Sequence, residues 1–227
     1  NKFIKLSYYI LHGIQQLAQP IRLLLAYTDT AYTDKRYRVG PKPDFDRSEW
    51  TNEKATLGLP FPNLPYYIDG DIKITQSLAV LRHLARKNHL MGESADEELR
   101  ISLAEQQLKD NNGAFVKICY NPLFEQLKAD YLKQLPQTLD LLSKFLAERP
   151  YFAGERLTYV DFLAYEYLDQ QKLFAPQLVS QYKNLDQYLG RIESLPTIDK
   201  YLKSDRYIKW PLNNDSAQFG SRLQSIP

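Results

Sequence analysis

The stretch from Phe61 to Ser77 brings together the groups best suited to bind a small charged ligand. Two short β-type runs flank an Asp-Gly-Asp turn at residues 69–71 and predict a β-hairpin. The second run leads through Thr75-Gln76-Ser77 into a predicted helix. Because the first turn of a helix has unpaired backbone N–H groups and the positive end of the helix dipole, Ser77 is placed to help bind a carboxylate. We therefore expect an anion site at this point.

The residues before the hairpin could pair with an extended peptide ligand. Pro65 cannot donate a backbone hydrogen bond, so it should lie at the first residue of its strand or on an edge. Leu64, which precedes this proline, is pushed into an extended conformation. We expect the backbone N–H and C=O of Leu64 to be free for a ligand next to the anion site.

The usual catalytic signatures are mostly absent from the sequence. The histidines, His12, His83 and His89, are too few and wrongly spaced for a metal site. Neither a Gly-x-Ser-x-Gly motif nor a phosphate-binding loop occurs. The chain also lacks a Cys-x-x-Cys motif, so dithiol exchange is not expected. We predict no metal and no resident cofactor.

The first ninety residues alternate between strand and helix patterns. The predicted elements are a strand at residues 3–9, a helix over 17–25 with Pro20 in its first turn, a strand at 32–37, a loop at 39–46, a short segment at 50–54, hairpin strands at 66–68 and 72–74, and a helix from 78. The first two strands should be parallel, with a right-handed crossover. The order βαβ, α, ββα predicts a thioredoxin-like domain, which we place at residues 1–90.

Strand signals stop after Met91, and helical patterns follow. Ser94 and Glu97 have the spacing of a capping box, which predicts a helix from there to about residue 117. Further helices are predicted at 134–148, with Pro136 in the first turn, at 159–172 and at 184–193. Thr158 and Asp161 form a second capping box, so Asp161 is interpreted as a structural residue. Residues 91–227 are therefore predicted to form an all-helical domain with a C-terminal tail.

The composition is that of an ordinary soluble globular protein, with 44% apolar and 25% charged residues. The net charge of +2, without a block of like charge, gives no support to a nucleic-acid partner. No apolar run is long enough to span a membrane. The first residues lack the apolar core of a signal peptide, and the single cysteine, Cys119, excludes an internal disulfide. We expect a cytoplasmic protein with neither nucleic-acid nor membrane partners.

The stretch from Phe61 to Ser77 resembles the glutathione site of the cytosolic glutathione S-transferases. Asn-Leu-Pro-Tyr, the Asp-Gly turn and Thr-Gln-Ser occur in that family in this order and spacing. The runs DFDRSEW at residues 44–50 and ICYNP at 118–122 make the chain similar to the mu class. The resemblance covers about residues 17–210. It implies an N-terminal thioredoxin-like domain that binds glutathione, a cis Leu64–Pro65 bond, and an all-helical domain that supplies the electrophile pocket.

The resemblance also assigns individual residues. Arg47, Trp50 and Lys54 are spaced to share one face of a helical turn, and two cations with an indole N–H suit the glycine carboxylate of glutathione. The implied glutathione-binding residues are Tyr8, Tyr9, Leu17, Arg47, Trp50, Lys54, Asn63, Leu64, Pro65, Gln76, Ser77 and Asp110. Tyr120, Phe115 and Trp210 would line the electrophile pocket, although core packing is an equal alternative for such walls. Asp110 would reach the ligand of the neighbouring subunit, with Phe61 and Arg82 at the interface of a homodimer.

A tyrosine hydroxyl is the expected catalytic group. In this family, a tyrosine at the end of the first strand stabilises the glutathione thiolate. Counting back from Gly13 by the family spacing selects Tyr8, whereas counting back from Pro20 selects Leu11, which has no donor. The simplest explanation is an insertion of Ile14-Gln15-Gln16. Tyr8 is the predicted donor; Tyr9 and an impaired site are the alternatives.

The resemblance implies a detoxifying transferase that conjugates reduced glutathione, as co-substrate, with hydrophobic electrophiles. Two other functions are open at this point. The chain could be a ligandin-like carrier that binds glutathione with weak turnover, or a glutathione-dependent lipid isomerase. Structural or translation-linked relatives of the fold should lack most of the constellation from Arg47 to Ser77, which is intact here.

Overall fold

The computed structural model describes residues 5–9, 15–41 and 43–224, with only the backbone for residues 5, 7–9, 15 and 16. Its N-terminal part contains a four-stranded sheet with strand order β2-β1-β3-β4. The strands are β1 (Lys5–Tyr9), β2 (Thr33–Tyr37), β3 (Tyr66–Asp69) and β4 (Ile72–Thr75). β1 pairs with β2 in parallel and with β3 antiparallel, and β3 and β4 form the predicted hairpin. Gly70, with a φ of 60°, occupies the left-handed position of the hairpin turn.

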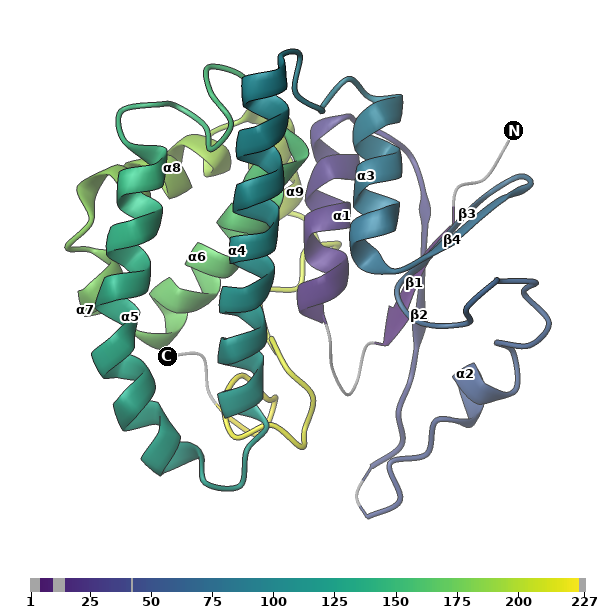
Figure 1. The fold of residues 1–227 in the computed structure, drawn as a ribbon. Helices are drawn as coiled ribbons and strands as arrows, with labels where there is room; N and C mark the ends of the chain where they lie inside the picture. Colours follow the sequence, from purple (N-terminus) through teal and green to yellow (C-terminus); the bar gives the residue numbers. More distant parts are fainter. Residues whose placement is uncertain (1–4, 10–14, 42, 225–227) are drawn as a thin grey trace.

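Three helices accompany the sheet: α1 (Gln15–Tyr27), α2 (Ser48–Thr51) and α3 (Ser77–Lys87). α1 and α3 lie side by side between the sheet and the helical part of the molecule, whereas α2 lies away from them (Figure 1). Element order and topology therefore confirm the predicted thioredoxin-like arrangement. The predicted position of Pro20 is wrong, because α1 begins at Gln15 and places Pro20 inside the helix. The polar start of α1 shows no apolar period, and this hid its first turn.

All later elements are helices. They are α4 (Ala95–Cys119), α5 (Phe124–Leu146), α6 (Tyr159–Phe174), α7 (Pro176–Val179), α8 (Lys183–Glu193) and α9 (Pro196–Leu202). The long helices α4 and α5 pack against each other on the outside, and α6 crosses behind them (Figure 1). None of the helices in the described ranges is long and apolar enough to cross a membrane.

Two predicted helix starts differ from the structure. α5 begins ten residues before the predicted position, so Pro136 lies in its interior rather than in its first turn. The first turns of α5 carry many polar residues, which weakened the sequence signal. In α4, the Ser94 hydroxyl accepts from the Glu97 N–H at 3.2 Å as expected, but the Glu97 carboxylate accepts from the N–H of Glu93 rather than of Ser94. The short helices α7 and α9 were not predicted.

Asp161 fixes the start of α6, which is the central helix of the domain. Its side chain is fully buried and accepts hydrogen bonds from the backbone N–H groups of Phe152 and Thr158, both at 2.8 Å. It also accepts from the hydroxyls of Thr158 at 3.1 Å and Tyr188 at 3.2 Å. The capping box and its structural role are confirmed. Burial raises the pKa of Asp161 to about 6 in spite of these donors.

Replacing Asp161 should destabilise the whole fold. Asp161→Ala leaves several buried donors without a partner, and we expect a loss of about 2 to 4 kcal/mol in the free energy of unfolding. Urea denaturation at fixed protein concentration measures this loss. Asp199→Ala is the matched control, because Asp199 makes only an exposed i,i+4 ion pair with Lys203 and should cost well under about 1 kcal/mol. Equal losses in the two variants would contradict this role of Asp161.

Candidate functional site

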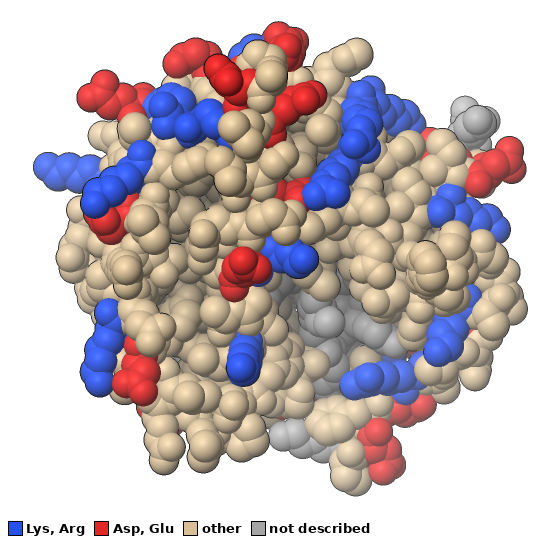
Figure 2. Space-filling model, in the orientation of Figure 1, with Lys and Arg blue, Asp and Glu red and all other residues tan. Residues whose placement is uncertain are grey.

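A cleft of about 830 Å³ lies between the two domains. α1 and α3 contribute one set of lining residues, and α4 and α6 contribute another. Figure 2 shows the surface hollowed between the helical part and the sheet side, with Lys, Arg, Asp and Glu interspersed over the face drawn. The lining residues of α1 are apolar, whereas α4 and α6 contribute both apolar residues, such as Leu108, Val116 and Leu163, and polar ones. The polar lining residues are Gln76, Ser77, Arg82, Glu105, Lys109, Asn112, Glu166, Asn213 and Asn214. The volume and lining are those of a small-molecule site.

The start of α3 opens onto this cleft. Gln76 and Ser77 both line it, and Ser77 is the first residue of the helix. Gln76 has a φ of 70°, a left-handed conformation that is uncommon for a residue with a side chain. This conformation ends β4 at Thr75 and turns the chain into α3. The predicted helix N-terminus is therefore present, and its first backbone N–H groups lie at the cleft.

The extended segment before β3 differs in one respect from the prediction. The Leu64–Pro65 bond is cis, as the resemblance implies. The Leu64 N–H is not free, however, because it donates to the side-chain oxygen of Asn63 at 2.9 Å. Within the described ranges the Leu64 carbonyl accepts no hydrogen bond, so one of the two expected backbone groups is open to a ligand. Asn63 is exposed, and Pro65 is buried.

Arg47, Trp50 and Lys54 follow one another over two consecutive helical turns. Backbone hydrogen bonds join Thr51 N–H to the Arg47 carbonyl at 3.0 Å and Lys54 N–H to the Trp50 carbonyl at 2.8 Å. Trp50 is 6% exposed and stacks on Tyr66, with ring centroids 5.9 Å apart. Arg47 and Lys54 are exposed, and their side chains have no ion-pair partner in the part of the chain that the structure describes. Two cations thus flank a fixed indole ring.

Tyr8 and Tyr9 form the end of β1, where the sequence predicts the catalytic hydroxyl. Their backbones pair with Arg36 and Tyr37 of β2. Their side chains lie outside the described part of the structure, so the choice between Tyr8 and Tyr9 stays a prediction. Of the proposed insertion, Ile14 also lies outside the described residues, and Gln15 and Gln16 form the start of α1.

The three residues predicted for the electrophile pocket lie in different parts of the structure. Tyr120 lines the cleft, and its hydroxyl accepts from the backbone N–H of Asn214 at 3.1 Å. Phe115 does not line it: this ring is fully buried and packs against Tyr131, Phe174 and Phe219. A helix residue two positions from a wall residue points elsewhere, and spacing alone did not reveal which face of α4 is open.

Trp210 is also absent from the cleft lining. Its indole N–H donates to the carbonyls of Ser221 at 3.1 Å and Gln224 at 3.0 Å, and its ring packs edge-on against Phe219. It therefore folds the C-terminal tail onto itself. Leu17, in contrast, lines the cleft and is 37% exposed.

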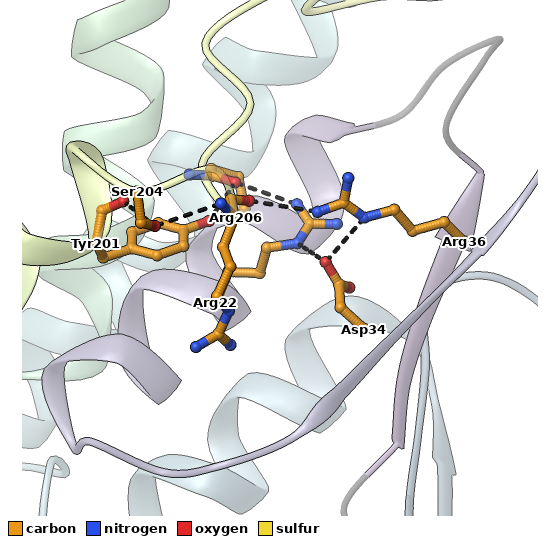
Figure 3. Close-up of polar contacts among 7 residues, drawn as sticks. Arg22, Asp34, Arg36, Tyr201, Ser204 and Arg206 are labelled. Atoms are coloured by element: carbon orange, nitrogen blue, oxygen red, sulfur yellow. Dashed lines mark hydrogen bonds and ion pairs between the residues drawn. The ribbon is translucent and has the colours of Figure 1, made fainter.

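The tail is fastened to the thioredoxin-like domain by a network of charged groups. Asp34 of β2 lies between Arg22 of α1 at 3.5 Å and Arg36 at 3.2 Å (Figure 3). Arg36 also donates to the backbone carbonyl of Arg206, just after α9, at 3.4 Å. The Arg206 N–H in turn donates to Ser204 at 3.3 Å. These contacts join β2 to the segment that leads to Asn213 and Asn214.

The residues predicted for a dimer interface are exposed to different degrees. Phe61 is 72% exposed, and Asp110 is exposed on α4. Arg82 lines the cleft and forms a two-pronged ion pair with Glu105, which is completely buried and also accepts from the Tyr159 hydroxyl at 2.8 Å. Arg82 is thus held within its own chain by α4, a contact that sequence reasoning missed.

Glu166 is a second carboxyl group that the sequence analysis did not identify. It lines the cleft from α6, and one of its oxygens accepts from the Gln170 amide at 2.6 Å. Burial and the nearby Asp169 carboxylate raise the pKa of Glu166 to about 8. Burial likewise raises the pKa of Asp169 to about 6. No local motif marks Glu166, because its environment comes from helices that are distant in sequence. No group of three or more possible metal ligands gathers among the described residues.

Comparison with known proteins agrees with this geometry. Residues 6–86 match the family model "Glutathione S-transferase, N-terminal domain", and residues 105–205 match "Glutathione S-transferase, C-terminal domain". The chain is 50% identical over 210 residues to glutathione S-transferase Mu 1 of Rattus norvegicus, covering 92% of this chain and 96% of the relative. The chain belongs to the glutathione S-transferase family.

Further relatives support the same family. A glutathione S-transferase of Dermatophagoides pteronyssinus is 53% identical over 193 residues, which cover 85% of this chain and 88% of the relative. The crystal structure of the glutathione S-transferase Blo t 8 superposes with a TM-score of 0.86 at 34% identity, covering 95% of this chain and 99% of that one. A Pi-class glutathione S-transferase of Onchocerca volvulus gives a TM-score of 0.80 at 30% identity, with coverage of 95% and 99%. The expected similarity to the mu class is confirmed.

The raised pKa of Glu166 should make stability depend on pH. A carboxyl group whose pKa is higher in the folded chain stabilises the fold at low pH, and this stabilisation is lost as the pH rises through the folded pKa. Glu166→Gln keeps the acceptor for Gln170 but cannot ionise. Between pH 5 and 8 the free energy of unfolding should decrease in the wild type by at least about 1.4 kcal/mol more than in Glu166→Gln.

Urea denaturation at fixed protein concentration across this pH range measures the difference. The exposed Glu148, replaced by Gln, is the control and should follow the wild-type curve. If Glu166→Gln and wild type give parallel curves, the pKa of Glu166 is not raised in the folded protein.

Proposed function

We propose that the protein conjugates the thiolate of reduced glutathione with hydrophobic electrophiles. The observation that carries this proposal is that the motif predicted to bind glutathione, residues 63–77, ends in the cleft between the two domains. Gln76 and Ser77, which complete the motif that starts at Asn63, line the same cleft as Leu108 and Val116 of α4. Membership of the glutathione S-transferase family, with about 50% identity over 92% of the chain, supports it.

In this proposal, three sets of groups bind glutathione. Arg47 and Lys54 bind the glycine carboxylate beside the fixed Trp50 ring, because their side chains have no competing ion-pair partner in the described structure. The open carbonyl of Leu64 receives the cysteinyl N–H of the extended tripeptide. The first turn of α3, with Ser77 and Gln76, binds the γ-glutamyl carboxylate through its backbone N–H groups and its dipole.

Activation of the thiol requires only a modest change in free energy. A free thiol has a pKa of about 8.5, so only a few per cent is thiolate at pH 7. Lowering this pKa by about two corresponds to about 2.7 kcal/mol in favour of the thiolate. A hydrogen bond to a charged acceptor contributes roughly 1.5 to 3 kcal/mol, so one phenol donor is sufficient. In this proposal, Tyr8 at the end of β1 donates that bond and stabilises the charge electrostatically.

The second substrate binds against the helical walls of the cleft. α4 contributes Leu108 and Val116, α6 contributes Leu163 and Tyr167, and α1 contributes Leu17. The apolar residues of these walls favour soft, hydrophobic electrophiles such as aryl halides, enals and epoxides, and Lys109, Asn112 and Glu166 add polar groups to the same walls. The Tyr120 hydroxyl accepts from Asn214 and can still donate its own proton toward a developing oxyanion.

We further propose that two copies of the chain form a homodimer in the cytoplasm. Phe61 projects a 72% exposed aromatic ring, which is costly to leave in water. Leu99 and Leu103 of α4 and Leu141 of α5 are also more than half exposed and offer an apolar surface of matching chemistry. In a two-fold dimer this contact occurs twice, so the Phe61 rings of both copies are buried.

Absorbance of bound glutathione thiolate against pH tests the catalytic proposal. In the wild type we expect an apparent thiol pKa about two below that of free glutathione, and Tyr8→Phe should return it to near the free value. Tyr9→Phe is the matched control and should leave the pKa low.

The possible outcomes separate the alternatives. A wild-type pKa equal to that of free glutathione, with normal glutathione affinity, would favour a carrier and overturn the transferase proposal. A low pKa that responds to Tyr9→Phe and not to Tyr8→Phe would assign the donor to Tyr9.

Sedimentation equilibrium tests the dimer. Burial of one phenylalanine contributes about 1.5 to 3 kcal/mol, and two are buried per dimer. Phe61→Ser should therefore raise the dimer dissociation constant by about 100-fold or more. Leu223→Ser is the control, since Leu223 is 67% exposed but lies in the tail. Dissociation constants that are the same for both variants would remove Phe61 from the interface.

A further inference from the structure

One face of α4 forms a long wall of the cleft. The residues that line it recur at intervals of three and four and include Leu108, Lys109, Asn112, Gly113 and Val116. This spacing is that of one helical face. Gly113 is the one position of this face that presents no side chain to the cleft.

Neither backbone conformation nor packing requires a glycine at position 113. The described glycines with a left-handed φ are Gly58, Gly70 and Gly220, and Gly113 is not among them. A Cβ atom at Gly92 would meet the backbone N of Glu98 at 2.8 Å, so packing explains that glycine. A Cβ atom at Gly113 would meet nothing within 4 Å.

Glycine is also a poor choice for the local structure. Gly113 lies in the interior of a helix of 25 residues, and among amino acids only proline favours a helix interior less than glycine does. Alanine would fit the space and stabilise α4. The missing side chain therefore has its clearest physical consequence in the cleft, where it leaves a recess between Lys109 and Val116.

From these observations we propose that Gly113 determines the size of electrophile that the cleft accepts. The recess receives a wide apolar group, such as a fused ring system, on the part of the electrophile that does not react. The proposal rests on the proposed transferase function and adds its substrate class. The cleft of about 830 Å³ that Gly113 lines also includes the start of α3, so it has to hold glutathione together with the electrophile.

The chain contains a matched control for this residue. Gly190 is the other described glycine inside a helix, and a Cβ atom there would also meet nothing within 4 Å. Gly190 is exposed on α8 and does not line the cleft. Substitutions at the two positions should thus change helix stability alike and differ in their effect on substrates.

The test compares Gly113→Ala, Gly113→Leu, Gly190→Ala and Gly190→Leu with the wild type. Two enones with the same reacting group, pent-3-en-2-one and 4-(2-naphthyl)but-3-en-2-one, serve as narrow and wide electrophiles. We expect Gly113→Leu to lower the naphthyl-to-methyl ratio of kcat/KM by about tenfold or more, because the side chain fills the recess. The KM for glutathione should not change. Both alanine variants should raise Tm by about 1 to 4 °C.

A binding measurement keeps the test independent of turnover. Calorimetric affinities for S-(2-naphthylmethyl)glutathione and S-methylglutathione should show the same selective loss in Gly113→Leu and none in Gly190→Leu. If Gly113→Leu leaves both ratios within twofold of the wild type, the proposal for Gly113 is overturned. A wild type that binds both conjugates but conjugates neither enone instead overturns the transferase function, and the binding ratio still decides the role of Gly113.

Discussion

Burial of α1 on two sides holds the two domains in one arrangement. Four of its apolar residues, Ile21, Leu23, Leu24 and Leu25, are completely inaccessible to solvent. α1 contacts α3 in its own domain and α6 and α9 in the helical domain. Because a helix that is apolar on most of its surface is stable only when it is covered on all sides, each domain covers surface that the other cannot. This packing determines where the start of α3 lies relative to α4, and so determines the cleft.

Charged groups inside this packing are satisfied by partners from different elements. Arg22 of α1 is 1% exposed and lies beside Asp34 of β2 and Gln19. A buried charge is costly, and at Asp161 and Glu166 of α6 this cost is reduced in another way. Both carboxyl groups accept hydrogen bonds, and both have a raised pKa that favours the neutral form. Helix α6 therefore combines two tasks: Asp161 in its first turn anchors the domain, and Glu166 faces the cleft.

The cleft joins two kinds of surface with different origins. The glutathione side comes from short local segments: Leu64 and Pro65 directly precede β3 and Gln76 directly follows β4, so their backbone groups lie at the same end of the hairpin. The electrophile side comes from the faces of long helices and from the tail around Asn214. Backbone N–H and C=O groups are present whichever side chain a residue carries, whereas the shape and polarity of a helix face change with every substitution on it. The first side therefore suits one constant ligand, and the second can be adjusted to different partners, as Gly113 illustrates.

The sequence by itself determined the order of the strands and of the longer helices, the hairpin, the cap at Asp161 and the helix N-terminus at Ser77. These features depend on neighbours in the chain: turn chemistry, apolar periods and capping distances act within a few residues. Only the tertiary structure decided that Phe115 lies in the core while Gly113 faces the cleft, and that Glu105 holds Arg82. Periodicity along α4 marks an apolar stripe but does not tell a stripe that packs from one that faces a cavity. That distinction depends on which distant helix covers the stripe, and here α5 and α6 pack against α4 and enclose Phe115.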